Sequence, residues 1–109
     1  PFHHERVGHA PEKISEIPVD WLSYAQLCDM PQGGTLSDAE AYFTDAIDGR
    51  LAPGEGVIPV AEMTRALPHD LPISLEIRSR FYRERYPDPI ERAKAILSQT
   101  QKFLTQHGL

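Results

Sequence analysis

The chain has 109 residues, of which 40% are hydrophobic and 25% are charged, a composition typical of one globular domain. No apolar stretch approaches the length of a membrane span, and glycine does not recur at every third position, so membrane-spanning and collagen-like proteins are excluded. The net charge of −5 argues against a nucleic-acid binder driven by overall charge.

The charge is distributed unevenly along the chain. Residues 1–77 hold four basic and thirteen acidic side chains, whereas residues 78–109 hold seven basic and three acidic ones. The single cysteine, Cys28, has no partner for an internal disulfide, and no signal peptide is visible, so we expect a cytoplasmic protein. Because the chain begins at Pro1 without an initiating Met, we interpret it as a fragment.

Short apolar runs alternate with helical patterns between the prolines and glycines. In chain order the patterns predict the end of a strand at residues 1–4, a helical turn at 11–17, a buried strand at 23–29, a helix at 37–49 that opens on a capping box, a helix at 59–67, a strand at 72–77 and a long helix at 88–108. The order strand, helix, strand, helix, strand, helix predicts a parallel sheet with right-handed crossovers. Three such units leave two sheet edges bare, so we expect a larger barrel or a second chain to complete them.

Polar residues stand at the carboxyl ends of the three predicted strands, where parallel α/β folds place their sites. They are His3 with His4, Gln26 with Asp29, and Glu76. An unpaired polar group in such apolar surroundings is costly, so Glu76 is either functional or a buried carboxylate paired with Arg78 or Arg80.

Gln26 and Asp29 are three residues apart on one strand and therefore point to opposite sides of the sheet. We expect Asp29 to cap the following loop. The amide oxygen of Gln26 suits Mg²⁺ or Mn²⁺, although a structural hydrogen bond is an alternative role. Cys28 has the pattern of a small buried apolar residue.

Two further segments have alternative interpretations. The turn Gly54–Gly56 either cradles an anion with its backbone amides or is a plain turn. The run Arg78–Arg85 (RSRFYRER) interleaves arginine with aromatic residues, a pattern that contacts nucleic acid or an anionic ligand unless it is a solvated helix face.

Four motifs taken in order, PFHHERVG, YAQLCDMP, RLAPGEG and SLEI, resemble the C-terminal part of the sugar phosphate isomerase/epimerase family with the xylose isomerase-like TIM barrel. The resemblance covers essentially all 109 residues. It implies that residues 1–109 are the C-terminal portion of a single domain of class α/β, namely the last three βα units of a (β/α)8 TIM barrel, incomplete on their own.

The resemblance also implies a site. In that family a Glu, an Asp, a His or Gln, and a Glu hold one divalent metal ion (Mn²⁺, Mg²⁺, Co²⁺ or Zn²⁺). Gln26 would be the third ligand and Glu76 the fourth, whereas the first two ligands would precede Pro1. His3 and Arg6 would bind substrate oxygens, and Arg78, or alternatively Arg80, would bind a substrate phosphate or carboxylate.

The implied activity is metal-dependent isomerisation or epimerisation of a sugar, sugar phosphate or related polyhydroxy carbonyl compound through an enediolate, with Glu76 as the catalytic acid or base. Gln26 also resembles the third ligand of some 3-dehydroshikimate dehydratases, so a lyase is an alternative. A further alternative is that the chain is a catalytically inert barrel fragment or an interaction module. We expect the chain to bind neither nucleic acid nor a membrane. We also expect that either other copies of the chain, in a homo-oligomer, or a missing N-terminal part of the barrel completes the fold.

Overall fold

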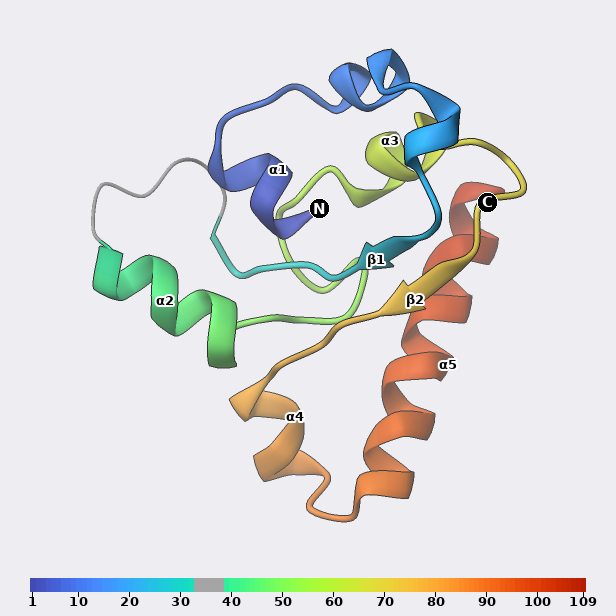
Figure 1. Ribbon diagram of the computed structural model, residues 1–109. Coiled ribbons are helices and arrows are strands. Elements are labelled where there is room, and N and C mark those ends of the chain that lie inside the picture. Colours follow the sequence, from blue (N-terminus) through green and yellow to red (C-terminus); the bar gives the residue numbers. More distant parts are fainter. Residues whose placement is uncertain (33–38) are drawn as a thin grey trace.

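The computed structural model describes residues 1–32 and 39–109 and contains helices of different lengths around a small sheet (Figure 1). In chain order the elements are α1 (Phe2–Arg6), the 3₁₀ helices η1 (Pro11–Glu16) and η2 (Val19–Trp21), β1 (Ala25–Leu27), α2 (Ala39–Asp48), α3 (Val60–Arg65), β2 (Ile73–Leu75), α4 (Arg80–Arg85) and α5 (Pro89–His107).

The sheet consists of β1 and β2, which pair in parallel with Ala25 opposite Ile73 and Leu27 opposite Leu75. In Figure 1 both arrows point toward the side of the molecule on which α1, α2 and α4 lie. The segment that follows α2 crosses this side, because Leu51 pairs antiparallel with Asp29 and Gly49 pairs antiparallel with Ser79. The carboxyl ends of both strands are therefore joined through a third extended segment.

The predicted fold class is wrong. Three βα units of a (β/α)8 TIM barrel require three parallel strands, whereas the described residues form two strands of three residues each. The parallel pairing of the second and third predicted strands is confirmed.

The strand predicted at residues 1–4 lies in the helix α1 instead. Phe2 and Arg6 are four residues apart, the spacing that brings two side chains to one face of a helix, and both are buried. The Arg6 guanidinium lies 5.7 Å from the centre of the Phe2 ring. The backbone amide of Glu5 bonds the Pro1 carbonyl at 2.9 Å, so this backbone satisfies itself locally without a neighbouring strand.

The three predicted helices after β1 are confirmed as α2, α3 and α5. The long last helix begins at its predicted cap, where the Asp88 carboxylate accepts hydrogen bonds from the amides of Ile90 and Glu91. It ends at Gly108, whose φ of 65° is left-handed, the conformation that favours glycine at a helix end. The capping residues expected for α2, Ser37 and Asp38, lie outside the described residues.

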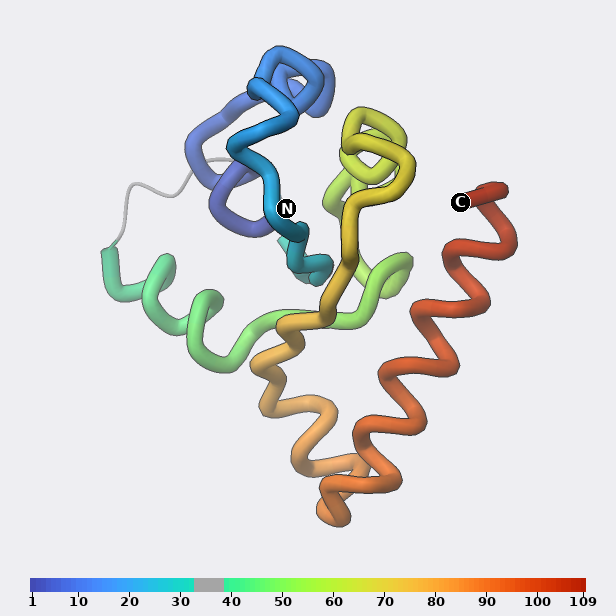
Figure 2. The backbone as a smooth tube through the Cα atoms, turned by 45° about the vertical axis from the view of Figure 1, so that its right-hand side comes forward, coloured from blue at the N-terminus to red at the C-terminus, as the bar shows by residue number. Residues whose placement is uncertain are grey.

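Among the described residues, a cluster of ten buried apolar side chains forms the core, and it includes Cys28, as predicted. Its members come from α1, η1, the end of β1, α3 with the loop before it, and α5: Phe2, Ile14, Leu27, Cys28, Met30, Ile58, Val60, Ala61, Met63 and Phe103. Figure 2 shows α4 and α5 as the two arms of a V that is closed where the two helices are joined, and Phe103 near the end of α5 packs into the core. None of the described helices combines the length and the apolar character needed to cross a membrane.

Candidate functional site around Glu76 and Arg50

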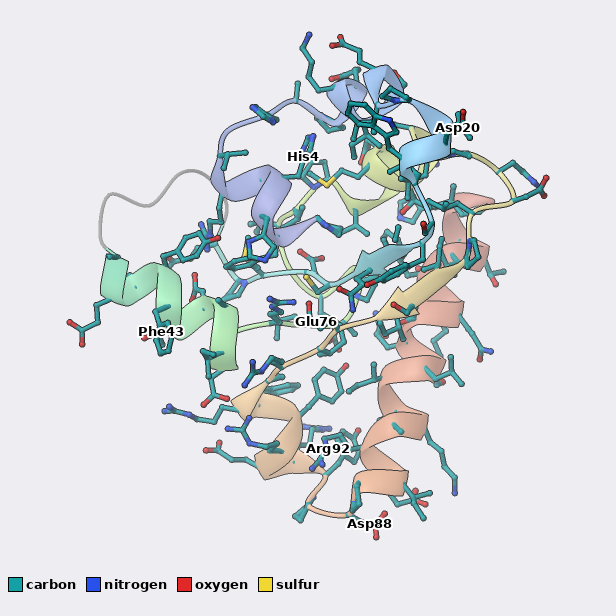
Figure 3. All side chains as sticks on the ribbon, in the orientation of Figure 1. His4, Asp20, Phe43, Glu76, Asp88 and Arg92 are labelled. Atoms are coloured by element: carbon teal, nitrogen blue, oxygen red, sulfur yellow. The ribbon has the colours of Figure 1, made fainter. Side chains whose placement is uncertain are left out.

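The parallel pairing places Gln26 and Glu76 on the same face of the sheet. Gln26 lies opposite Ser74, and the ladder continues one step beyond β2, where the Glu76 amide donates to the Leu27 carbonyl at 3.1 Å. Since side chains alternate along a strand, Ser74 and Glu76 project to one side, together with Gln26. Gln26 is exposed and Glu76 is half-buried. Figure 3 shows Glu76 just beyond the tip of the β2 arrow, near the centre of the molecule.

Arg50 holds Glu76 at two points. Its Nη1 atom donates to the Glu76 carboxylate in a very short contact and to the Glu76 backbone carbonyl at 3.3 Å. The side chain of Arg50 is 6% exposed, whereas that of Glu76 is 38% exposed. The Glu76 carboxylate therefore reaches solvent, while the cationic side chain that holds it is buried.

The surroundings of Arg50 fix its guanidinium in place. The guanidinium lies 4.9 Å from the centre of the Phe2 ring, a cation–π geometry. The Arg50 amide donates to the Arg78 carbonyl at 3.0 Å, and the next residue, Leu51, exchanges two backbone hydrogen bonds of 2.8 Å with Asp29. The Nε atom of Arg50 is buried and has no hydrogen-bond partner among the described residues. A buried donor without a partner is costly unless a ligand or water supplies an acceptor.

The predicted substrate-binding residues His3 and Arg6 both contact α2. The His3 ring and the Tyr42 hydroxyl share a hydrogen bond of 2.7 Å at the surface. Arg6 donates from Nη2 to the Asp45 carboxylate at 2.5 Å, and the Arg6 side chain is fully buried. Both contacts join α1 to α2, so Arg6 has a structural partner within the chain.

Arg78, the third predicted substrate-binding residue, is exposed and makes no side-chain hydrogen bond or ion pair within residues 1–32 and 39–109. It lies two residues after Glu76, at most about 7 Å away between Cα atoms. Its side chain lines a hollow that also receives Arg83 and Arg92.

Asp29 is the anion that the Gly54–Gly56 turn cradles. Its carboxylate is buried, and one oxygen accepts from the amides of Gly54 and Gly56, both at 3.0 Å. The other oxygen accepts from Met30 at 2.8 Å and from Ile58 at 2.9 Å. Asp29 thus caps the loop that follows β1, as predicted, and also the Gly54–Gly56 turn. Because the amides of Gly54 and Gly56 both bond Asp29, they are not free to bind a ligand.

The thiol of Cys28 lies beside this site but is inert. Burial raises the pKa of Cys28 above its ordinary value, and the nearby Arg50 lowers it by less. The thiol therefore stays protonated at neutral pH, and only the thiolate is a strong nucleophile.

A divalent metal ion does not fit the donors that the described residues bring together. Gln26 and Glu76 share a face, but the Glu76 carboxylate is already paired with the Arg50 cation, which would repel a metal ion. No group of three or more His, Cys, Asp or Glu side chains suited to a metal exists among residues 1–32 and 39–109. One neutral oxygen and one neutralised carboxylate leave most of the coordination shell to water.

Two residues of this site, Arg50 and Tyr42, were not predicted as functional. Arg50 carries a recognisable sign in the sequence, because it is the only basic residue between Lys13 and Arg65 in an acidic part of the chain. An isolated arginine among acidic residues is typical of a specific ion pair. Tyr42 gives no comparable sign, since its spacing in α2 is that of a core residue.

Comparison with family models, with curated proteins and with solved structures found no match to this chain. The xylose isomerase-like resemblance of the four motifs therefore stays a prediction from the sequence.

Proposed function

We propose that the face around Glu76 and Arg50 binds a sugar or related polyhydroxy carbonyl compound and catalyses proton transfer next to its carbonyl group. The observation that supports this is the half-exposed Glu76 carboxylate fixed by a buried arginine. A carboxylate held in one orientation is suited to act as a general base, because geometry limits proton abstraction before pKa does.

Arg50 supplies the second requirement of this reaction. When a base removes a proton from the carbon beside a carbonyl, negative charge develops on the carbonyl oxygen. A preorganised cation stabilises that charge at little reorganisation cost. Arg50 has a fixed guanidinium, and because its Nε atom is buried, its positive charge acts on the oxygen from beneath the surface rather than through a hydrogen bond from Nε.

The proton balance favours isomerisation. Glu76 accepts the proton from the carbon next to the carbonyl, which gives an enediolate whose oxygens face Arg50. Glu76 then returns the proton to the former carbonyl carbon on the same face, and the hydroxyl proton moves to the other oxygen. One carboxylate can perform both transfers, whereas an epimerase needs a second acid on the opposite face of the substrate.

The exposed amide of Gln26 is placed to orient a substrate hydroxyl, since it lies on the same face as Glu76. Because the donor set does not fit a metal ion, the chemistry of this proposal is assigned to Glu76 and Arg50. The predicted role of Gln26 as a metal ligand is replaced here by a hydrogen-bonding role.

The test follows proton exchange by ¹H NMR in ²H₂O. The protein is incubated with a panel of aldoses, ketoses and their phosphates, and the loss of the proton next to the carbonyl is measured. We expect exchange and aldose–ketose conversion with the wild type, and a decrease of roughly 10²- to 10⁴-fold in Glu76→Gln, which keeps the shape but does not accept a proton. Glu62→Gln, an exposed carboxylate on α3, is the matched control and should keep the wild-type rate.

Three results would overturn the proposal. They are the absence of exchange with the whole panel, an unchanged rate in Glu76→Gln, and an unsaturated product. The last result would identify elimination, the lyase chemistry of the alternative prediction.

A further inference from the structure

The hollow beside Arg78 is the place where four segments of the chain converge. We call it the arginine pocket and define it by Arg78, Arg83, Arg92 and Asp48, with Ile47 and Ile77 as its apolar wall. Its volume is about 510 Å³, within the range of small-ligand sites. Figure 3 shows Arg92 between α4 and α5.

The pocket carries more positive than negative charge. Arg83 donates to the Asp48 carboxylate at 2.5 Å, and Arg80 approaches the same carboxylate at 3.4 Å from outside the pocket. This hydrogen bond from Arg83 is the main reason that the pKa of Asp48 is lowered, so Asp48 stays ionised at neutral pH. Three arginines and one aspartate leave two positive charges.

Two of the three arginines have no acidic partner among the described residues. Arg92 donates from Nη1 to the neutral carbonyls of Tyr86 and Pro87, at 3.1 and 3.4 Å. Arg78 has no side-chain partner there at all. Arginines grouped without carboxylates repel one another, and a bound dianion removes this repulsion.

We propose that the arginine pocket binds the phosphate group of a phosphate monoester. A phosphate dianion matches the two uncompensated charges, and planar guanidinium groups bind phosphate oxygens in a two-pronged geometry. Ile47 and Ile77 give the carbon skeleton of the ester an apolar wall. This inference concerns binding and stands independently of the proton transfer proposed for Glu76.

A nucleic-acid ligand is disfavoured by the aromatic residues of this region. Single-stranded nucleic acid requires exposed rings on which bases stack. Tyr82 is instead buried, with its hydroxyl donating to Glu55 at 2.7 Å. Phe81 is 48% exposed, but one edge of its ring packs against Tyr82 with 5.3 Å between ring centres. The run Arg78–Arg85 therefore offers one exposed ring rather than a series of rings on which successive bases could stack.

The test is calorimetric titration at low salt with inorganic phosphate, ribose 5-phosphate, ribose and a short oligonucleotide. We expect both phosphates to bind, with a dissociation constant of about 1 mM or tighter, and we expect ribose, whose proposed site lies at Glu76, not to compete with inorganic phosphate. If ribose 5-phosphate binds more tightly than inorganic phosphate, the phosphate belongs to a larger ligand, and equal affinities identify a site for the phosphate group alone.

Arg78→Gln removes an exposed side chain that supports no other residue, and we expect it to weaken phosphate binding at least about tenfold. Arg85→Gln is the matched control, since it removes the same charge from α4 outside the pocket and should change the affinity less than about twofold. Equal losses in the two variants, no phosphate binding by the wild type, or tighter binding of the oligonucleotide than of either phosphate would overturn the inference.

Discussion

One nitrogen of Arg50 donates to both the side-chain carboxylate and the backbone carbonyl of Glu76. The guanidinium therefore fixes the backbone just beyond β2 as well as the carboxylate attached to it. A side chain clamped to its own backbone through a third group has few alternative rotamers, which is a form of preorganisation.

We expect Arg50→Lys to reduce the free energy of unfolding by about 1–3 kcal/mol. This loss lies between the losses that are typical when an exposed and when a buried ion pair is broken. Lysine keeps the charge but loses the planar group that stacks on Phe2 and that reaches both the carboxylate and the backbone carbonyl of Glu76. Urea denaturation measures the change. Arg65→Lys, at an exposed position that donates to the His107 carbonyl, is the control, and equal stability of the two variants would contradict the structural role of Arg50.

Asp29→Asn should destabilise the protein by about 2–5 kcal/mol, because an amide nitrogen would replace one of two oxygens that each accept two backbone hydrogen bonds. Two backbone amides would then face a donor in place of their acceptor. The exposed Asp20→Asn is the control, with an expected change within about 0.5 kcal/mol. Similar denaturation midpoints for Asp29→Asn and the wild type would show that the loop contributes little to stability.

His4 should make the protein less stable in mild acid. Burial, followed by the neighbouring His9, lowers the pKa of His4, and both ring nitrogens lack a partner among the described residues. The unfolded chain therefore binds a proton near pH 6.5 that the folded chain rejects until lower pH, so the stability that is complete above about pH 6.5 decreases below it.

His4→Met tests this pH dependence, since methionine fills similar space without titrating. We expect the variant to be at least as stable as the wild type at acidic pH and to lose part of the slope of unfolding free energy against pH. His69→Gln, which alters a fully exposed ring, should keep the wild-type slope. A slope unchanged by His4→Met would assign the pH dependence to other groups.

The chain should bind Mn²⁺ weakly, with a dissociation constant above about 1 mM, because Glu76 is neutralised by Arg50 and Gln26 is uncharged. Electron paramagnetic resonance of free Mn²⁺ gives the binding curve directly. A stoichiometric micromolar site that Gln26→Ala abolishes would instead support the ligand set that the resemblance implies.

Local rules predicted the elements well where the sequence terminates them itself. Asp88 and Gly108 bound α5 through hydrogen bonds to the nearest turns, so no distant residue is needed to place its ends. The segment Phe2–Arg6 was misassigned because four consecutive polar residues have no strong period. Its helical state depends on burying Arg6 against Asp45 of α2 and Phe2 against Arg50, which are 39 and 48 residues away along the chain.

The site was predicted only in part. The resemblance implied that Gln26 and Glu76 share one site, and the register does bring both side chains to one face of the sheet. The partner of Glu76 is a long-range property: Arg78 and Arg80 are its nearest arginines in sequence, yet Arg50 binds it because the segment after α2 crosses the strand ends. Spacing in the sequence carries no information on such a crossing.

The cradle around Asp29 ties the end of β1 to a loop whose amides are 25 to 29 residues further along the chain. The amides of Gly54, Gly56 and Ile58 share one carboxylate, so freeing one of them requires moving the group that protects the others. In native-state hydrogen exchange these three amides should therefore open as a single unit with one common protection factor, although they belong to a segment without regular secondary structure.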